Sequence, residues 1–280
     1  MILENVVRHL VCCFSDSSQK DSSDKPENSE NLDLAGPGGW FGRIWQNPWL
    51  VFLLPFFVYM IVGQFEPTSS DSSNFLTKWV PYEYYPWIYT LKIALTLVAI
   101  MLVWPGYRQF PFKVSWLAVG VGVVGVVLWV GLTKLDIESY LSFFGLTELG
   151  KRTAFNPFEV YESSPAAIWS FLGVRFFGLM IVIPIIEEFF LRGFIMRFFI
   201  ERDWWKVPFG NVTPVAIIAG TVVPMLSHPL TELLAVAVWF SLVTWLMIRT
   251  KNIWDCVVAH MVTNGLLGVY VIISGDWYLW

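Results

Sequence analysis

Long apolar runs constrain the fold of this chain more than any other feature, and one of them extends almost unbroken from Trp169 to Ile200. About 20 apolar residues in a helix span the hydrocarbon of a bilayer, so this run predicts a membrane helix. Within it, the segment Pro184–Gly193 carries two adjacent carboxylates and a guanidinium. Because such charges are costly at the bilayer centre, they indicate a functional site.

Several further apolar runs predict an all-α fold, a polytopic transmembrane helical bundle. Charged residues make up only 14% of the chain, against about 25% in soluble proteins. The seven expected spans are residues 47–63, 84–104, 114–133, 166–200, 212–226, 230–248 and 253–273. The fourth would be about 50 Å long, which exceeds a hydrocarbon core of ~30 Å. It must therefore tilt, kink at Pro184 or protrude, and a break in two would make eight spans.

The chain is expected to form one domain after a tail. Residues 1–40 are predicted to be a disordered N-terminal tail, because Ser, Asp, Asn, Lys, Glu and Pro dominate them. Residues 41–280 are predicted to form a single transmembrane helical domain, with a catalytic core in 166–273. The three cysteines form neither a metal nor a disulfide framework.

Basic residues gather on one side of the expected bundle, which predicts a cytosolic N-terminus. They are Arg43, Arg108, Lys113, Arg197, Arg202, Lys206, Arg249 and Lys251. No basic patch indicates nucleic acid, so the lipid bilayer is the expected surrounding. Small residues in the third span predict close helix packing there; they are Ala118, Gly120, Gly122, Gly125 and Gly131.

The two adjacent carboxylates have different expected environments. On a helix, Glu188 and Arg192 are i,i+4 neighbours and can pair, whereas Glu187 points about a third of a turn away and stays free for chemistry. From these residues alone, three interpretations stay open: hydrolytic chemistry, ion or proton coupling in a transporter, and a structural charge cluster.

Two histidines and an amide favour hydrolysis. His260 and Asn264 are i,i+4 on one face of the seventh span, and His228 lies at the end of the fifth. Together with Glu187 they offer water a base, an orienting group and donors for an oxyanion. His228 would lie deeper in the membrane than the others, so the fifth helix must tilt or its start must protrude if His228 belongs to the site.

Arg175 is also buried by sequence, on nearly the same helix face as Glu187. It is expected either to pair with an acid such as Glu232 or Asp255, or to bind a carboxylate of the substrate.

The ordered motifs resemble those of the CAAX prenyl protease and bacteriocin-processing family of intramembrane endopeptidases. The motifs are Glu187-Glu188-x-x-x-Arg192, then His228, then His260-x-x-x-Asn264. Their surroundings look most like the bacterial branch associated with exosortase sorting systems. One departure is Pro224, which stands where the family has Phe, four residues before the histidine.

The resemblance implies an endopeptidase of membrane-associated proteins or peptides. Glu187 would activate the attacking water, with His228 helping to hold it, and His260 and Asn264 would stabilise the oxyanion. Glu188 and Arg192 would fix the helix and tune charge. We expect no metal; were zinc required, Glu187, His228 and His260 would be its ligands. The resemblance also implies a multi-pass protein of a bacterial inner membrane and a link to an exosortase-type system.

Two other classes of protein remain as alternatives. A transporter could use the same carboxylates, although the sequence shows no inverted repeat. A non-catalytic member of the family could act as a membrane scaffold or immunity protein.

Overall fold

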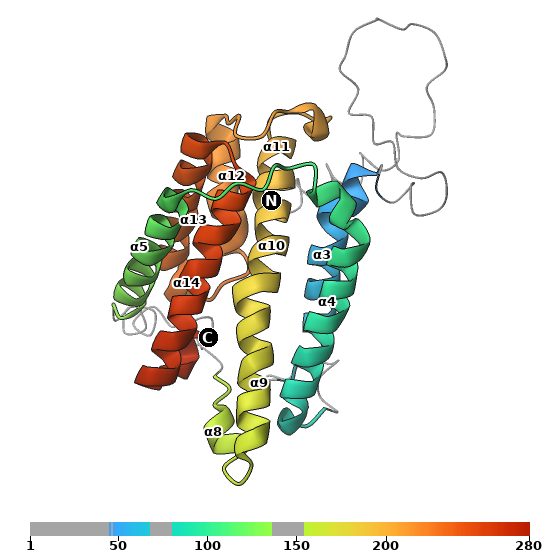
Figure 1. Cartoon of the computed structure of the whole chain (residues 1–280). Helices are drawn as coiled ribbons and strands as arrows, with labels where there is room; N and C mark the ends of the chain where they lie inside the picture. Colours follow the sequence, from blue (N-terminus) through green and yellow to red (C-terminus); the bar gives the residue numbers. More distant parts are fainter. Residues whose placement is uncertain (1–44, 46, 68–79, 136–153) are drawn as a thin grey trace, which may run out of the picture. The chain divides into compact units, whose positions relative to one another are not determined.

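The computed structural model describes residue 45 and residues 47–67, 80–135 and 154–280. Within these ranges the chain forms helices and no strands (Figure 1), so the predicted all-α fold is confirmed. The predicted tail, residues 1–40, lies outside the described residues.

The helices of the described ranges are joined by connections of different lengths, and the two longest, 64–81 and 134–156, include residues outside those ranges. In chain order they are α3 (Pro48–Gly63), η1 (Tyr82–Tyr84), α4 (Tyr85–Tyr107), α5 (Trp116–Thr133), α8 (Pro157–Val160), α9 (Pro165–Phe177), η2 (Gly178–Val182), α10 (Ile183–Glu188), η3 (Phe189–Ile195), α11 (Met196–Phe198), η4 (Trp204–Lys206), α12 (Pro214–Met225), η5 (Leu230–Glu232), α13 (Leu233–Thr250), α14 (Ile253–Ser274) and η6 (Trp277–Leu279). Each of the seven predicted segments is helical, with ends that differ by a few residues.

Five helical runs are long and apolar enough to cross a membrane, so this is a multi-pass membrane protein. They are 82–107, 116–133, 165–198, 230–250 and 253–274. The helices α3, with 16 residues, and α12, with 12, are apolar but shorter. Whether these two also cross the bilayer stays a prediction, and so does the count of seven.

Side-chain caps and prolines start several helices where the sequence changes from polar to apolar. The side chain of Asn47 accepts from Trp49 and Leu50 at the start of α3, and Asn252 caps α14 in the same way. Proline stands in the first turn of α3, α4, α9 and α12, where its missing N–H costs no helical hydrogen bond.

The fourth segment is one continuous helical run, so the predicted alternative of a break into two spans is wrong. Two π-helical stretches, η2 and η3, interrupt the α-helical pattern instead. In η2 the N–H of Ile183 donates to Gly178 O. The next N–H would be that of residue 184, which is proline and has none. The carbonyl of Leu179 therefore has no partner in its own helix and is available to another side chain.

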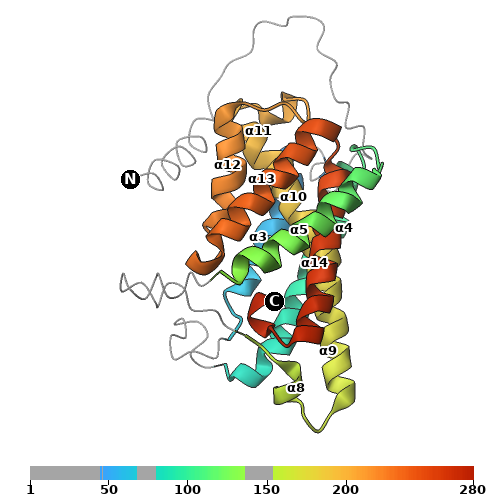
Figure 2. The same cartoon turned by 90° about the vertical axis from the view of Figure 1, so that its left-hand side faces the viewer.

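The helix α12 ends at Met225, a few residues before Pro229. Because a residue that precedes a proline disfavours the helical conformation, the helix does not continue to Pro229. Its 12 residues rise only about 18 Å. Figure 2 shows α12 ending well short of the lower end of α9. The segment after α12 thereby brings His228 to the cavity, while the depth of His228 in the bilayer stays a prediction.

Glycines bring α5 against its neighbours, as predicted for two of the small residues. A Cβ at Gly122 would lie 2.7 Å from the carbonyl oxygen of Ala259 on α14. One at Gly125 would lie 2.1 Å from the indole of Trp239 on α13. A Cβ at Gly120 or Gly131 would meet nothing within 4 Å, so packing explains only the first two.

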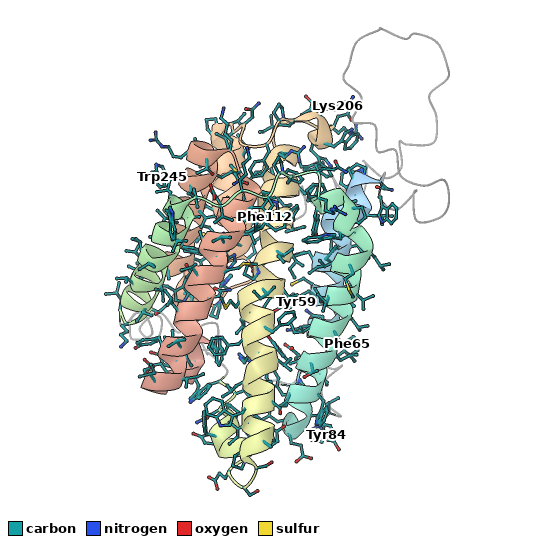
Figure 3. The ribbon with its side chains drawn as sticks, viewed as in Figure 1. Tyr59, Phe65, Tyr84, Phe112, Lys206 and Trp245 are labelled. Atoms are coloured by element: carbon teal, nitrogen blue, oxygen red, sulfur yellow. The ribbon has the colours of Figure 1, made fainter. Side chains whose placement is uncertain are left out.

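Large apolar side chains cover the outside of the described helices, as expected where lipid is the neighbour. In Figure 3, Phe65 and Trp245 point outward, and each is more than two-fifths exposed. Lys206 lies near one end of the bundle and Tyr84 near the other. Aromatic and basic residues at the two ends of an apolar band are typical of the membrane–water interface.

Candidate active site

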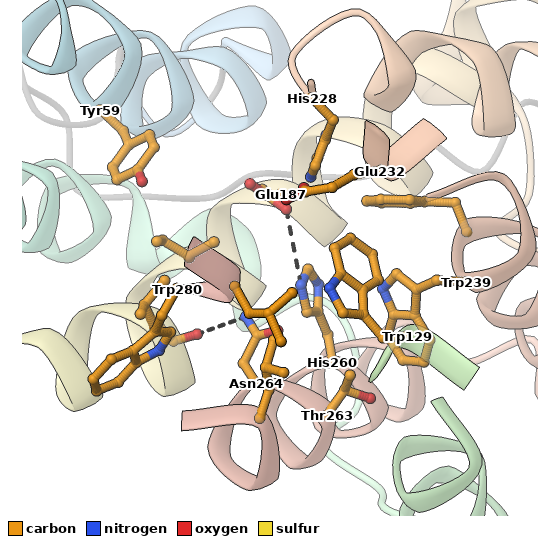
Figure 4. Close-up of a pocket in the computed structure, with 15 residues that line it drawn as sticks. Tyr59, Trp129, Glu187, His228, Glu232, Trp239, His260, Thr263, Asn264 and Trp280 are labelled. Carbon is orange, nitrogen blue, oxygen red and sulfur yellow. Dashed lines mark hydrogen bonds and ion pairs between the residues drawn. The ribbon is translucent and has the colours of Figure 1, made fainter. Parts of the chain in front are cut away.

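A cavity of about 210 Å³ lies between α3, the η2–α10 segment, the α12–α13 connection and α14. Its polar lining includes four residues of the predicted site, Glu187, His228, His260 and Asn264 (Figure 4). Glu232 and Thr263 also line it. Aromatic side chains complete the wall: Tyr59, Trp129, Trp239, Phe240 and Trp280. A cavity with these polar groups in its lining has room for water beside the acid.

Glu188 and Arg192 form the predicted i,i+4 pair, and both side chains are fully buried. Arg192 Nη1 lies 2.9 Å from Glu188 Oε2 and donates to Oε1 over 3.1 Å. Arg192 Nη2 donates to the carbonyl of Phe240 on α13 over 3.2 Å. The pair therefore also ties the fourth segment to α13.

His260 lies between the two adjacent glutamates. Its Nδ1 is 2.9 Å from Glu188 Oε1, and its Nε2 is 3.9 Å from Glu187 Oε2. A carboxylate accepts hydrogen bonds, so Nδ1 carries the proton of this contact. Glu188 thereby fixes the ring and turns Nε2 toward Glu187. The sequence predicted the Glu188–Arg192 pair but not this second contact of Glu188.

Glu187 is the acid that faces the cavity. Its side chain is about a quarter exposed, whereas that of Glu188 has no exposure. Among the described residues, no Lys or Arg lies within ion-pair distance of Glu187, and His260 is its nearest basic partner. The acid expected to stay free is thus the one that meets the cavity.

His228 is held by the residue that departs from the family pattern. Its Nδ1 is 2.8 Å from the carbonyl oxygen of Pro224, so this nitrogen donates. Its ring also packs edge-on against Trp129 and Phe240, with centroids 6.0 and 6.3 Å apart. Figure 4 shows the imidazole pointing toward Glu187. The backbone of Pro224, rather than its side chain, positions the histidine.

Asn264 reaches across to the π-helical stretch. Its Nδ2 donates over 2.8 Å to the carbonyl of Leu179, the group that Pro184 leaves without a helical partner. The amide is thereby oriented, and its second N–H remains for another acceptor. Pro184, which the sequence indicated as a kink, thus leaves free the carbonyl group that positions Asn264.

No three His, Cys, Asp or Glu side chains of the described ranges are grouped so that they could hold a metal ion. Glu187, His228 and His260 nevertheless face one cavity, and Glu188 and Pro224 hold only the Nδ1 atom of each imidazole. The Nε2 atoms have no such partner among the described residues, so the need for a metal stays a prediction.

Arg175 lies beside the cavity rather than in its lining. Neither Glu232 nor Asp255 pairs with it; Asp255 instead accepts from the backbone N–H of Ser115 over 2.7 Å. The guanidinium donates to the hydroxyl of Tyr85. The predicted ion pair is therefore wrong, because α4 covers Arg175 with aromatic side chains.

Nothing in the sequence indicated the aromatic wall. Trp239 packs against the His260 ring with centroids 5.8 Å apart, and Tyr59 comes from α3. Single aromatic residues in apolar spans look alike in a sequence, so only packing distinguishes those that face the cavity.

The fold and the cavity define a class: a helical, multi-pass membrane protein in which an acid, two imidazoles and an amide line one cavity. Residues 169–266 match the family model described as type II CAAX prenyl endopeptidase, Rce1-like. This segment contains Glu187, His228, His260 and Asn264. The match supports an intramembrane protease, a hydrolase. No curated protein and no solved structure matches the chain.

Proposed function

We propose that this protein is an intramembrane endopeptidase, which hydrolyses a peptide bond of a membrane-associated protein or peptide with water activated by Glu187. One observation carries the proposal. Glu187 Oε2 and His260 Nε2 face each other over 3.9 Å at the cavity, while Glu188 holds the other nitrogen of the ring. The match of residues 169–266 to the prenyl endopeptidase family supports the same chemistry.

Water attack needs a base and a place for the developing negative charge. As the water oxygen bonds to the scissile carbonyl carbon, Glu187 takes one proton. The carbonyl oxygen becomes an oxyanion, which accepts from the free N–H of Asn264. It also accepts from His260 Nε2 when the ring is doubly protonated, a charge that Glu188 compensates. Glu187 then returns the proton to the leaving nitrogen as the C–N bond breaks.

His228 orients the water in this scheme. Because its Nδ1–H donates to the carbonyl of Pro224, Nε2 of the neutral ring has a free lone pair. That lone pair can accept the second hydrogen of the water molecule while Glu187 accepts the first.

We propose that the reaction needs no metal. Metal analysis of the purified protein, combined with activity after chelation and dialysis, tests this point. Full activity in protein with no stoichiometric metal is the expected result; loss on chelation with recovery on adding zinc would contradict it.

We further propose a bacterial inner-membrane protein with a cytosolic N-terminus, linked to an exosortase-type sorting system. Arg108, Lys113 and Lys251 are found in the connections at one end of the described helices, and Arg249 lies in the last turn of α13, which supports the orientation. Labelling of single cysteines placed in these connections, from each side of sealed vesicles, tests it.

The activity itself is tested with the full chain in liposomes. A farnesylated CAAX peptide, a leader peptide and a sorting-signal protein are offered in parallel, and cleavage is followed by mass spectrometry. Cleavage of at least one by the wild type and of none by Glu187→Gln is expected. Equal cleavage by both would contradict the role of Glu187, while transport without cleavage would favour the transporter.

A further inference from the structure

A hydroxyl group that belongs to none of the sequence motifs lines the catalytic cavity. It is that of Tyr59 on α3, which lies outside residues 169–266, the segment that matches the family model. Figure 4 shows the ring across the cavity from Trp239, with its hydroxyl pointing away from α3. The proposed chemistry gives this hydroxyl no role.

The Tyr59 hydroxyl is available to a ligand. Within the described residues it makes no hydrogen bond, and its oxygen is not one of the buried polar atoms that are closed off without a partner. The oxygen therefore opens onto the cavity that its ring lines. The neighbouring Tyr89 differs, because its hydroxyl donates to the carbonyl of Arg175 over 3.4 Å. A phenol O–H can donate to water or to an oxygen of the substrate.

A buried ion pair lies against the ring of Tyr59. Lys92 on α4 is 4% exposed, and its ammonium is 4.3 Å from the centroid of the Tyr59 ring. A carboxylate oxygen of Glu66 is 2.7 Å from the same ammonium. The pair is neutral as a whole, but its positive end is placed on the ring. Because a nearby cation favours negative charge on the phenol, it makes the O–H a stronger donor toward an anion.

The groups already assigned to the chemistry come from other walls of the cavity. Asn264 and His260 lie on α14, and Glu187 lies on α10. A substrate carbonyl in the cavity would therefore have α3 on its remaining side. Donors that are in place before the reaction stabilise the developing charge, and losing one costs roughly 10²–10³ in kcat.

We propose that Tyr59 is a further catalytic residue, whose hydroxyl donates a hydrogen bond to the oxyanion, and that Lys92 strengthens this donor from the face of the ring. This inference rests on the proposed function, because the oxyanion forms only when water attacks the peptide carbonyl. The phenol keeps its proton throughout. Negative charge develops on the carbonyl oxygen, which accepts from Tyr59, and returns to the carbonyl bond as the C–N bond breaks. Lys92 acts through Tyr59 and is a positioning residue.

Cleavage by the full chain in liposomes is the first test. Tyr59→Phe removes only the hydroxyl, so kcat should fall roughly 10²-fold while KM stays within a few-fold. Lys92→Met with Glu66→Gln, which leaves no buried charge behind, should lower kcat by a smaller factor. Adding this pair to Tyr59→Phe should lower kcat no further, since Lys92 acts through the hydroxyl.

Tyr89→Phe is the matched control. Lys92 also lies over the Tyr89 ring, 4.9 Å from its centroid, but Tyr89 is not part of the cavity lining. This variant should keep the wild-type kcat. An unchanged kcat in Tyr59→Phe, a rise in KM alone, or an equal fall in Tyr89→Phe would overturn the proposal. If Glu187→Gln abolishes cleavage and Tyr59→Phe does not affect it, the proposed function stands without this inference.

A second measurement needs no turnover. Fluorotyrosine is placed at position 59 of the Glu187→Gln variant in nanodiscs, and its fluorine resonance reports on the phenol. A dansylated, farnesylated tetrapeptide with a phosphinate in place of one peptide bond supplies tetrahedral anionic oxygens. It should shift the resonance more than the parent peptide does, and fluorotyrosine at position 89 should show no such difference. Bound phosphinate without a shift would overturn the proposal. Absence of both cleavage and phosphinate binding would overturn it together with the proposed function.

Discussion

Two buried arginines of one helical run have opposite environments. Arg192 is fully buried and lies 2.9 Å from a carboxylate, whereas Arg175 is 6% exposed and is surrounded by aromatic rings. The Nε atoms of both arginines lack an acceptor. The two residues therefore differ in whether a carboxylate compensates the charge of the guanidinium. Arg192 has its own carboxylate partner and can act as a rigid support, while Arg175 has aromatic partners and, among the described residues, no carboxylate within ion-pair distance.

The same contrast separates the adjacent glutamates. Glu188 has an arginine and a histidine as partners and is fully buried, while Glu187 has one distant imidazole contact and faces the cavity. The glutamate with several charged partners thus supports the site, whereas the glutamate with few partners is available to react.

The largest expected effect is on activity at Glu187. Glu187→Gln should lower the rate of cleavage roughly 10²–10⁴-fold, as for loss of a general base, and leave the thermal unfolding temperature unchanged. Rates and unfolding are measured on the same reconstituted protein. A large fall in stability would mean that Glu187 belongs to the support.

Loss of Arg192 from its pair with Glu188 should lower the free energy of unfolding more than any other substitution. Arg192→Met leaves the buried carboxylate of Glu188 uncompensated, which is expected to destabilise the fold by about 3–5 kcal/mol. Denaturant titration in detergent measures the change. The double variant with Glu188→Gln should recover much of it, and an equal loss in single and double variants would contradict the pairing argument.

Asn264→Ala should affect turnover more than binding. The variant removes an oxyanion donor, and losses of about 10²–10³ in kcat are typical of such changes, while KM should stay within a few-fold. Asn264→Asp, which keeps the shape without the donors, serves as the partner variant. A rise in KM with unchanged kcat would place Asn264 in substrate binding.

Arg175→Met should cost far less stability than Arg192→Met, about 1 kcal/mol or less, because no buried acid is left behind. The comparison uses the same denaturant titration. A loss as large as that of Arg192→Met would reveal a compensating anion and remove the contrast between the clusters.

The smallest effect is expected at the exposed pair of Lys206 and Asp203, whose charged atoms are 2.7 Å apart. Lys206→Ala should change stability by less than about 0.5 kcal/mol, since solvent screens such pairs. This value sets the baseline for the buried clusters, and a larger loss would show that the assay overstates charge effects.

Much of this architecture could be predicted from the sequence. The helical segments followed from apolar runs and their polar or proline boundaries, and Glu188–Arg192 followed from helical spacing. The fourth segment is one run, as the range 166–200 predicted, and the alternative of a break in two was wrong because the helix continues through Pro184 after a π-helical stretch. The pairing of Arg175 with an acid was wrong because the sequence does not show that aromatic residues of α4 cover it.

The sequence by itself determined the helices, their membrane character and the contacts within one turn, since the helical period fixes which side chains are neighbours. Only the tertiary structure decided that Glu188 holds His260, that Leu179 orients Asn264, and that Trp280 lines the cavity and contacts Arg175. These contacts join residues far apart in the chain, and helix crossing and close packing at glycines set them.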